Sequence, residues 1–212
     1  KKSNILYGLN KTKQYIKEKD SIIVVEGPTD LIRLYQNNVK NVVAIGGTAF
    51  NEIQARALKY ESKNIYINLD SDEKFQGQKA ASRAGYILFK NGIEPKIISL
   101  PLNSDPDDFI KEKGIDIYLE YINKSKKLIE FDYEIYKSIN KENANPQGFV
   151  DKIKDEIISI NNLIYREIAI QNLSKVINVS IESIQSSIQD LINKKNKWKK
   201  NKKNETAINQ KS

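Results

Sequence analysis

The 212-residue sequence contains no cysteine, no histidine and no methionine, and the first two absences narrow its chemistry. Without cysteine and histidine there is no disulfide, no thiol nucleophile, no histidine general base and no common structural zinc site. Any reaction must therefore use carboxylates, lysines, hydroxyls or a metal ion held by oxygen ligands. Because the sequence lacks methionine and starts at Lys1, we expect it to be a fragment of a longer protein.

Long apolar runs are also missing. No stretch approaches the roughly 20 apolar residues that cross a bilayer, and no targeting segment is recognisable. A chain of this length buries about 70% of its unfolded surface, so it needs neither disulfides nor zinc for stability. We therefore expect a soluble, cytoplasmic protein without membrane contact.

The net charge of +8 is concentrated at the C-terminal end. Residues 193–212 hold eight lysines and one acid, a net charge of +7, so the preceding residues are almost balanced at +1. Such a lysine-rich segment has too few apolar residues to fold, and we expect a basic disordered tail. It is either a solubilising linker or a nucleic-acid contact, in which Lys199 binds phosphate and Trp198 stacks on a base.

Short β-branched runs alternate with segments of helical periodicity, which predicts an α/β fold with an open, mostly parallel sheet flanked by helices. Strands are expected at 21–26, 41–45, 64–69 and 96–100, with helices at 29–38, 51–60 and 77–90. From about residue 115 onward no further strand is expected, and apolar residues three or four apart predict an all-helical subdomain. The predicted parts are an N-terminal segment (1–20), the α/β domain (21–126), the helical subdomain (127–195) and the tail (196–212).

Acidic residues follow three of the predicted strands: Glu26 after the first, Asp70 and Asp72 after the third, and Asp105 and Asp107 after the fourth. The carboxyl ends of parallel strands meet at one edge of a sheet, where ligands bind. Clustered carboxylates repel one another unless a cation neutralises them, and Mg²⁺ prefers oxygen ligands. The pattern therefore indicates a divalent-metal site.

Each acid also has a simpler structural interpretation. An acid in a loop after a strand is commonly a helix cap, and Asp105 precedes a proline at the start of an expected helix. Asp30 could favour the first turn of its own helix through the helix dipole.

Two motifs resemble the Toprim domain of bacterial primases, topoisomerases, small nucleases and recombination factors. They are Val25-Glu26-Gly27 with Asp30, and Leu69-Asp70-Ser71-Asp72 with Ala80-Ala81. Four further matches resemble the DnaG-type primase branch: Lys2 with Leu6-Tyr7-Gly8-Leu9, Gly47-Thr48-Ala49 with Gln54-Ala55-Arg56, Leu100-Pro101 with Asp105-Pro106-Asp107, and Pro146-Gln147-Gly148 before the last helices.

The resemblance implies a Toprim fold followed by the helical subdomain of a primase RNA polymerase core. It implies a nucleotidyltransferase that synthesises short RNA primers on a DNA template with two or more Mg²⁺ or Mn²⁺ ions. Glu26, Asp70 and Asp72 would be catalytic and carry the ions, with proton transfer as the alternative role of Glu26. Asp105 and Asp107 would add metal ligands or tune metal occupancy. No zinc is expected in this segment, which by itself is not necessarily active.

The implied partners are single-stranded DNA, ribonucleoside triphosphates and a replicative helicase, the last through a domain outside this sequence. Lys2 and Asp30 would belong to the nucleic-acid and nucleotide contacts, and the protein would act at the replication fork as part of the primosome. A frayed terminal lysine is the alternative interpretation of Lys2.

The sequence also departs from the family pattern. Ser71 stands where the family usually has glycine, and the following loop at 73–77 is about two residues longer, so the loop is expected to differ in shape. Two other functions stay open. One is a small Toprim nuclease that cleaves structured RNA, and the other is a non-catalytic nucleic-acid-binding module.

Overall fold

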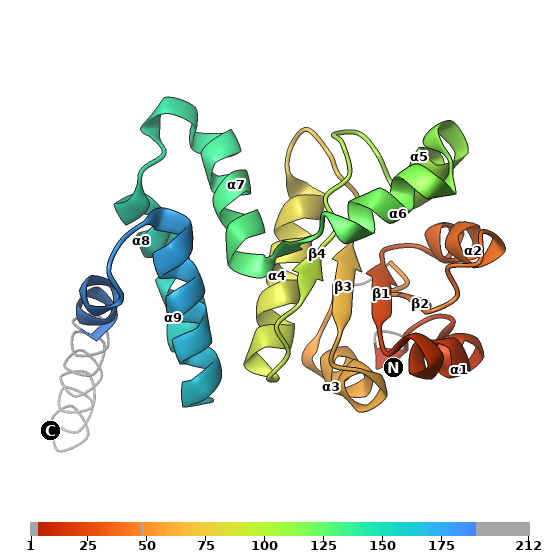
Figure 1. The fold of residues 1–212 in the computed structure, drawn as a ribbon, viewed down its shortest axis with the longest axis horizontal. Helices are drawn as coiled ribbons and strands as arrows, with labels where there is room; N and C mark the ends of the chain where they lie inside the picture. Colours follow the sequence, from red (N-terminus) through yellow and green to blue (C-terminus); the bar gives the residue numbers. More distant parts are fainter. Residues whose placement is uncertain (1–3, 48, 190–212) are drawn as a thin grey trace, which may run out of the picture. The chain divides into compact units, whose positions relative to one another are not determined.

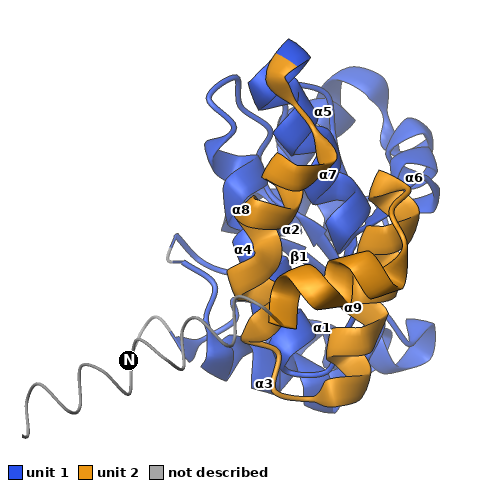
Figure 2. Cartoon of the chain, turned by 90° about the vertical axis from the view of Figure 1, so that its left-hand side faces the viewer, with its two compact units in different colours: residues 1–142 blue, residues 143–212 orange. Residues whose placement is uncertain are grey.

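The computed structural model describes residues 4–47 and 49–189. It divides into two compact units, residues 1–142 and 143–212, coloured separately in Figure 2. The first unit contains the sheet and the strand-end acids, and the second is helical.

A five-stranded sheet forms the centre of the first unit (Figure 1). Its order is β2 (Val42–Ala44), β1 (Ile22–Val25), β3 (Ile65–Asn68), β4 (Lys96–Ile97) and β5 (Lys126–Lys127). The first four strands are parallel, and β5 pairs antiparallel with β4. The central strand β1 consists only of buried Ile and Val, as expected for a strand covered on both faces.

Helices cover both faces of this sheet. The first unit contains α1 (Leu9–Lys19), α2 (Pro28–Gln36), α3 (Glu52–Glu61), α4 (Gln76–Lys90), α5 (Pro106–Lys113), α6 (Ile115–Asn123) and α7 (Leu128–Asn140). On one face, Ile23 and Val25 of β1 share a core with α2, α5 and α6. The connections that contain α3 and α4 run along the sheet in the opposite direction to α2, so right-handed crossovers place both helices on the other face.

The second unit contains α8 (Pro146–Ile158), α9 (Leu163–Ile177) and a further helical stretch at 181–189. Asn145 caps α8 by accepting a hydrogen bond from the Gly148 N–H, and Asn162 caps α9 in the same way. Buried Phe149 and Leu173 form part of its apolar interior. None of the helices in the described residues is long and apolar enough to span a bilayer.

The structure confirms the predicted fold class, and each predicted helix and the first three strands lie within two residues of their expected bounds. The expectation of no strand after residue 115 was wrong, because β5 forms at 126–127. Two lysines at a sheet edge carry no β-branched signal, although charge is a common feature of edge strands. The four predicted domain limits stay a prediction, and the tail beyond residue 189 lies outside the described residues.

Candidate active site at the carboxyl edge of the sheet

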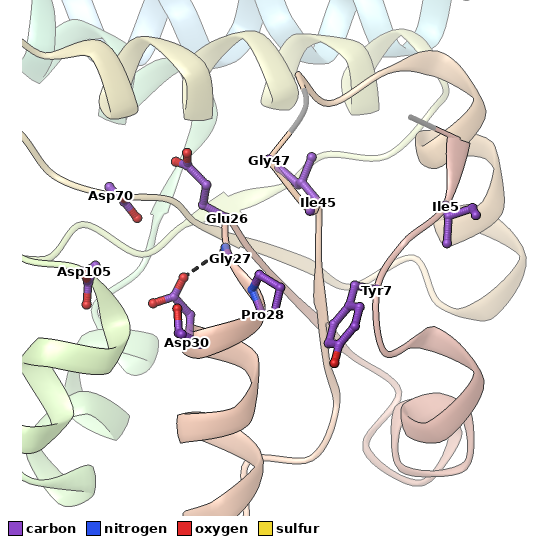
Figure 3. Close-up of a pocket in the computed structure, with 12 residues that line it drawn as sticks. Ile5, Tyr7, Glu26, Gly27, Pro28, Asp30, Ile45, Gly47, Asp70 and Asp105 are labelled. Carbon is purple, nitrogen blue, oxygen red and sulfur yellow. Dashed lines mark hydrogen bonds between the residues drawn. The ribbon is translucent and has the colours of Figure 1, made fainter. Parts of the chain in front are cut away.

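A cavity of about 650 Å³ opens at the carboxyl ends of the parallel strands (Figure 3). Four acidic residues line it: Glu26, Asp30, Asp70 and Asp105. They come from the loops after β1, β3 and β4 and from the first turn of α2. The strand topology therefore brings together acids that are up to 79 positions apart in the sequence.

Backbone pairing holds two of these acid-bearing loops side by side. Ser71 and Ser104 form an isolated antiparallel bridge, with N–H to carbonyl distances of 3.0 and 3.2 Å in the two directions. Each serine is adjacent to an acid of the cavity, Asp70 and Asp105 respectively. The bridge thus fixes the distance between the two loops independently of any metal ion.

The electrostatics show that the acids share one environment. Burial, followed by the nearby charges of Glu26, Asp105 and Asp72, raises the pKa of Asp70 to about 6. Burial, followed by Asp30 and Asp72, also raises the pKa of Glu26. Since like charges and desolvation both disfavour the ionised form, a cation placed among these carboxylates would be stabilised.

Asp30 is a buried structural acid as well as a cavity residue. Its Oδ2 accepts a hydrogen bond from the Gly27 N–H at 3.0 Å, and its Oδ1 accepts one from the Asp107 N–H at 3.3 Å. Burial nevertheless dominates and raises the pKa of Asp30 to about 6. Its predicted nucleotide-binding role stays a prediction.

Asp72 holds the longer loop together. Its carboxylate accepts hydrogen bonds from the backbone N–H groups of Lys74, Gln76 and Gly77 at 2.9, 3.1 and 2.7 Å. These bonds lower the pKa of Asp72. They also satisfy donors at the start of α4, where Phe75 has a positive φ of 56° and offers no side-chain cap. In this arrangement Asp72 acts as a helix cap.

The loop also brings α4 very close to the acids. A Cβ added to Gly77 would overlap the Asp70 carbonyl oxygen, so only glycine allows this approach. Ser71 is buried, and its Oγ accepts a hydrogen bond from Gln78 Nε2 at 2.9 Å. In this loop Phe75 adopts the positive φ, while Ser71 joins the bridge to Ser104, and the expected difference from the family loop stays a prediction.

Asp107 is engaged by two cations. Arg33 Nε and Lys111 Nζ each donate to it at 2.6 Å, one to each carboxylate oxygen. They lower the pKa of Asp107, Lys111 more strongly than Arg33. Asp107 therefore differs from Glu26 and Asp70, whose charges no neighbouring cation among the described residues balances.

Three acids of the cavity, Glu26, Asp70 and Asp105, keep carboxylate oxygens that no described residue engages. In the described part of the chain, no three acids already stand close enough to hold one ion together. The carboxylates of Glu26 and Asp70 accept no hydrogen bond from the described residues, and the Asp105 carboxylate uses only Oδ1, as the cap of α5. Their oxygens are the hard donors that Mg²⁺ or Mn²⁺ prefers, and all three line the same cavity.

No residue pattern predicts Tyr7 as part of the site, although Tyr7 belongs to the Leu6-Tyr7-Gly8-Leu9 string. The Tyr7 backbone pairs with Ala44 at the outer edge of β2, and this pairing places Tyr7 in the cavity wall. Lys2, Trp198 and Lys199 lie outside the described residues, so their roles stay predictions.

The parallel sheet and the acids at its carboxyl edge define the first unit as a Toprim-like domain. Residues 23–110 match the family model described as Toprim-like. This confirms the resemblance drawn from the Glu26 and Asp70 motifs.

Longer matches extend beyond this domain. The chain is 42% identical over 130 residues to the DNA primase of Aquifex aeolicus, covering 61% of this chain and 26% of the relative. It is 34% identical over 198 residues to the DNA primase of Clostridium acetobutylicum, covering 92% of this chain and 32% of the relative. The chain thus spans about a quarter to a third of the length of these curated relatives.

Solved structures agree with the sequence relatives. The crystal structure of the Aquifex aeolicus primase, comprising its zinc-binding and RNA polymerase domains, matches 87% of this chain and 44% of that chain with a TM-score of 0.70 and 33% identity. A DnaG primase catalytic domain shares the fold with a TM-score of 0.67 and 21% identity, over 82% of this chain and 57% of that chain. The chain is a homologue of the RNA polymerase domain of DnaG-type DNA primases.

Proposed function

We propose that this chain provides the metal-binding centre of an enzyme that synthesises short RNA primers on single-stranded DNA from ribonucleoside triphosphates. The observation that carries the proposal is the meeting of Glu26, Asp70 and Asp105, from three separate strand ends, at one cavity. The homology to primase catalytic cores supports the same reaction class.

Glu26, Asp70 and Asp105 would hold two Mg²⁺ or Mn²⁺ ions. When bound, such ions lower the pKa of a 3′-hydroxyl and stabilise negative charge on the reacting phosphates. The chain's own residues supply position and charge. The Ser71–Ser104 bridge fixes Asp70 relative to Asp105, and the pKa of Asp70 near 6 leaves it ionised at neutral pH.

Asp72 and Asp107 have supporting roles in this proposal. Direct coordination by Asp72 would require at least one of its backbone hydrogen bonds to break, and coordination by Asp107 would compete with Arg33 and Lys111. We therefore assign both acids mainly to shaping the loop and the field around the ions. Either could still coordinate an ion through a carboxylate oxygen after rearrangement.

The proposed partners follow from the reaction class. A DnaG primase catalytic domain of this fold has been solved bound to ssDNA, and we propose the same ligand here. Lys2, Trp198 and Lys199 are proposed to contact nucleic acid, and a replicative helicase would bind through another part of the whole protein. The proposed location is the replication fork in the bacterial cytoplasm.

The test is primer synthesis on single-stranded DNA with ribonucleotides and Mg²⁺ or Mn²⁺, using the longest protein that the surrounding reading frame encodes. Asp70→Asn preserves size and is expected to abolish product. Full activity of this variant would overturn the assignment. If the wild-type protein instead cleaves structured RNA and makes no primer, the nuclease alternative replaces the proposal.

A separate measurement tests the metal site in the 212-residue chain itself. Mn²⁺ is expected to raise the melting temperature of the wild type, because a ligand that binds only the folded state stabilises it. Asp70→Asn should lose this increase. Equal increases in the two proteins would mean that the ion binds elsewhere.

A further inference from the structure

A second cavity adjoins the carboxylate cavity and shares Glu26 with it. Its volume is about 330 Å³, at the small end of the range of ligand cavities and suited to a single nucleotide unit. The lining is largely apolar and includes Phe50, Leu69, Ala80, Ala84 and Ile87. Apolar and aromatic walls accept the face of a base without demanding a particular sequence.

Arg83 gives this second cavity its charge. It lies on α4, is exposed, and forms no ion pair with the described residues. Among the described residues that line the two cavities containing Glu26, Arg83 is the only cation. The nearby cations Arg33 and Lys111 are already engaged by Asp107. A phosphate beside Glu26 would therefore be attracted mainly to Arg83.

Lys79 extends this positive charge along α4. It lies four residues before Arg83, so both side chains are on the same helix face, with Cβ atoms about 6 Å apart. Lys79 is also exposed and free of ion pairs with the described residues. The close approach of Gly77 to Asp70 fixes α4 against the acid-bearing loop, so both cations have a defined position relative to the carboxylates.

We propose that the second cavity binds one nucleotide unit of a single-stranded nucleic acid, with its base against Phe50 and Ala80 and its flanking phosphates on Lys79 and Arg83. The proposal rests on the proposed function, because templated transfer requires a strand beside the Glu26 carboxylate. The site deepens the proposed function by assigning a strand contact to α4.

The absence of cysteine makes a direct test possible. Ala80→Cys places the chain's only thiol in the cavity wall. In EDTA and without ribonucleotides, an oligothymidylate of about ten nucleotides should slow maleimide labelling of this thiol several-fold. Arg56→Cys on α3 is the matched control, because Arg56 is exposed and does not line the cavity. Its labelling rate should not change.

The salt dependence of strand binding tests the proposed contact between Arg83 and a phosphate. For single strands each phosphate contact contributes about 0.7 to the slope of log K against log salt. Arg83→Ala should reduce the slope by about that amount, whereas Arg56→Ala, with the same charge change, should not. The lysines of the tail contribute equally in both variants, so the difference isolates Arg83. Circular dichroism would verify that all variants are folded.

Several outcomes would overturn the proposal. Unprotected labelling of the Ala80→Cys protein, or equal slopes for Arg83→Ala and Arg56→Ala, would exclude a strand in this cavity. Protection by thymidine monophosphate as strong as that by the oligonucleotide would identify the ligand as a free nucleotide. Since these measurements need neither metal nor catalysis, their failure is distinguishable from failure of primer synthesis.

Discussion

Asp70 is expected to reduce the stability of the metal-free protein, so Asp70→Asn should stabilise it while removing metal binding. The pKa of Asp70 is raised from 3.8 to about 6 in the folded state. Two pKa units correspond to about 3 kcal/mol, and because Asp70 is only half buried, solvent screening reduces this to about 1 to 2 kcal/mol. For a chain of this size the melting temperature should rise by about 2 to 8 °C.

The pH dependence follows from the direction of the shift. A folded-state pKa above the unfolded one means that the stabilising contribution of protonated Asp70 is fully present below about pH 4. It is lost as the pH rises through about 6. The advantage of Asp70→Asn should therefore be complete at pH 8 and vanish near pH 4. Urea unfolding in EDTA across this range measures it, and a variant no more stable than wild type at pH 8 would refute the reasoning.

Asp72→Asn is the matched control, and it is expected to lower the free energy of unfolding, whereas Asp70→Asn should raise it. Asp72 lies two residues away, but its carboxylate accepts three backbone N–H bonds, and its pKa is lowered. An amide cannot accept all three bonds, so the variant should lose about 1 to 2 kcal/mol. The stability that Asp72 provides is present above pH 4 and is lost as the pH falls further. Equal effects of the two substitutions would contradict their different environments.

Three further outcomes are expected. Gly77→Ala should cost more than about 2 kcal/mol in urea unfolding because its Cβ would meet backbone. Its control, Gly85→Ala on the same helix, should cost less than Gly77→Ala, because its Cβ would meet the side chain of buried Leu128 and not backbone. Tyr118→Phe should cost about 1 to 2 kcal/mol by the same assay, because the Tyr118 hydroxyl donates to buried Asn68 Oδ1 at 2.7 Å. Mn²⁺ at ten times its dissociation constant should stabilise the chain by about 1.4 kcal/mol in calorimetry, and EDTA should reverse this.

A specific result would contradict each of these predictions. A neutral Gly77→Ala variant would mean that α4 does not approach the acid-bearing loop as described. An unchanged Tyr118→Phe variant would mean that Asn68 finds another donor. Stabilisation by Mn²⁺ that persists in Asp70→Asn would place the ion outside the cavity.

The parallel core was predictable because its signals are local. Four consecutive β-branched residues at 22–25 can be buried on both faces of a sheet, and the glycine and acid after them mark the strand end. The meeting of Glu26, Asp70 and Asp105 was predictable for a related reason, since parallel strands must end at one edge. Strand β4 was overestimated, because pairing stops at Ile97 although the apolar run continues.

The different structural roles of the acids could not be predicted from the sequence. Asp107 is engaged by Arg33, which lies 74 positions away, and no local pattern indicates that contact. Asp72 caps α4 because the loop turns through a positive φ at Phe75, a conformation that an aromatic residue rarely adopts. Asp105 is both a predicted metal ligand and a helix cap, so its two interpretations are compatible.

The charges of the two cavities determine the order in which metal ion, nucleotide and strand are expected to bind. Glu26, Asp70 and Asp105 bring three carboxyl groups to one cavity, and the described residues lining that cavity include no cation. A triphosphate entering alone would be repelled, so a divalent ion must bind before it or with it. Arg83 lies in the adjoining cavity and needs no metal to attract phosphate. Strand binding should therefore tolerate EDTA, whereas nucleotide binding beside Asp70 should require Mg²⁺ or Mn²⁺.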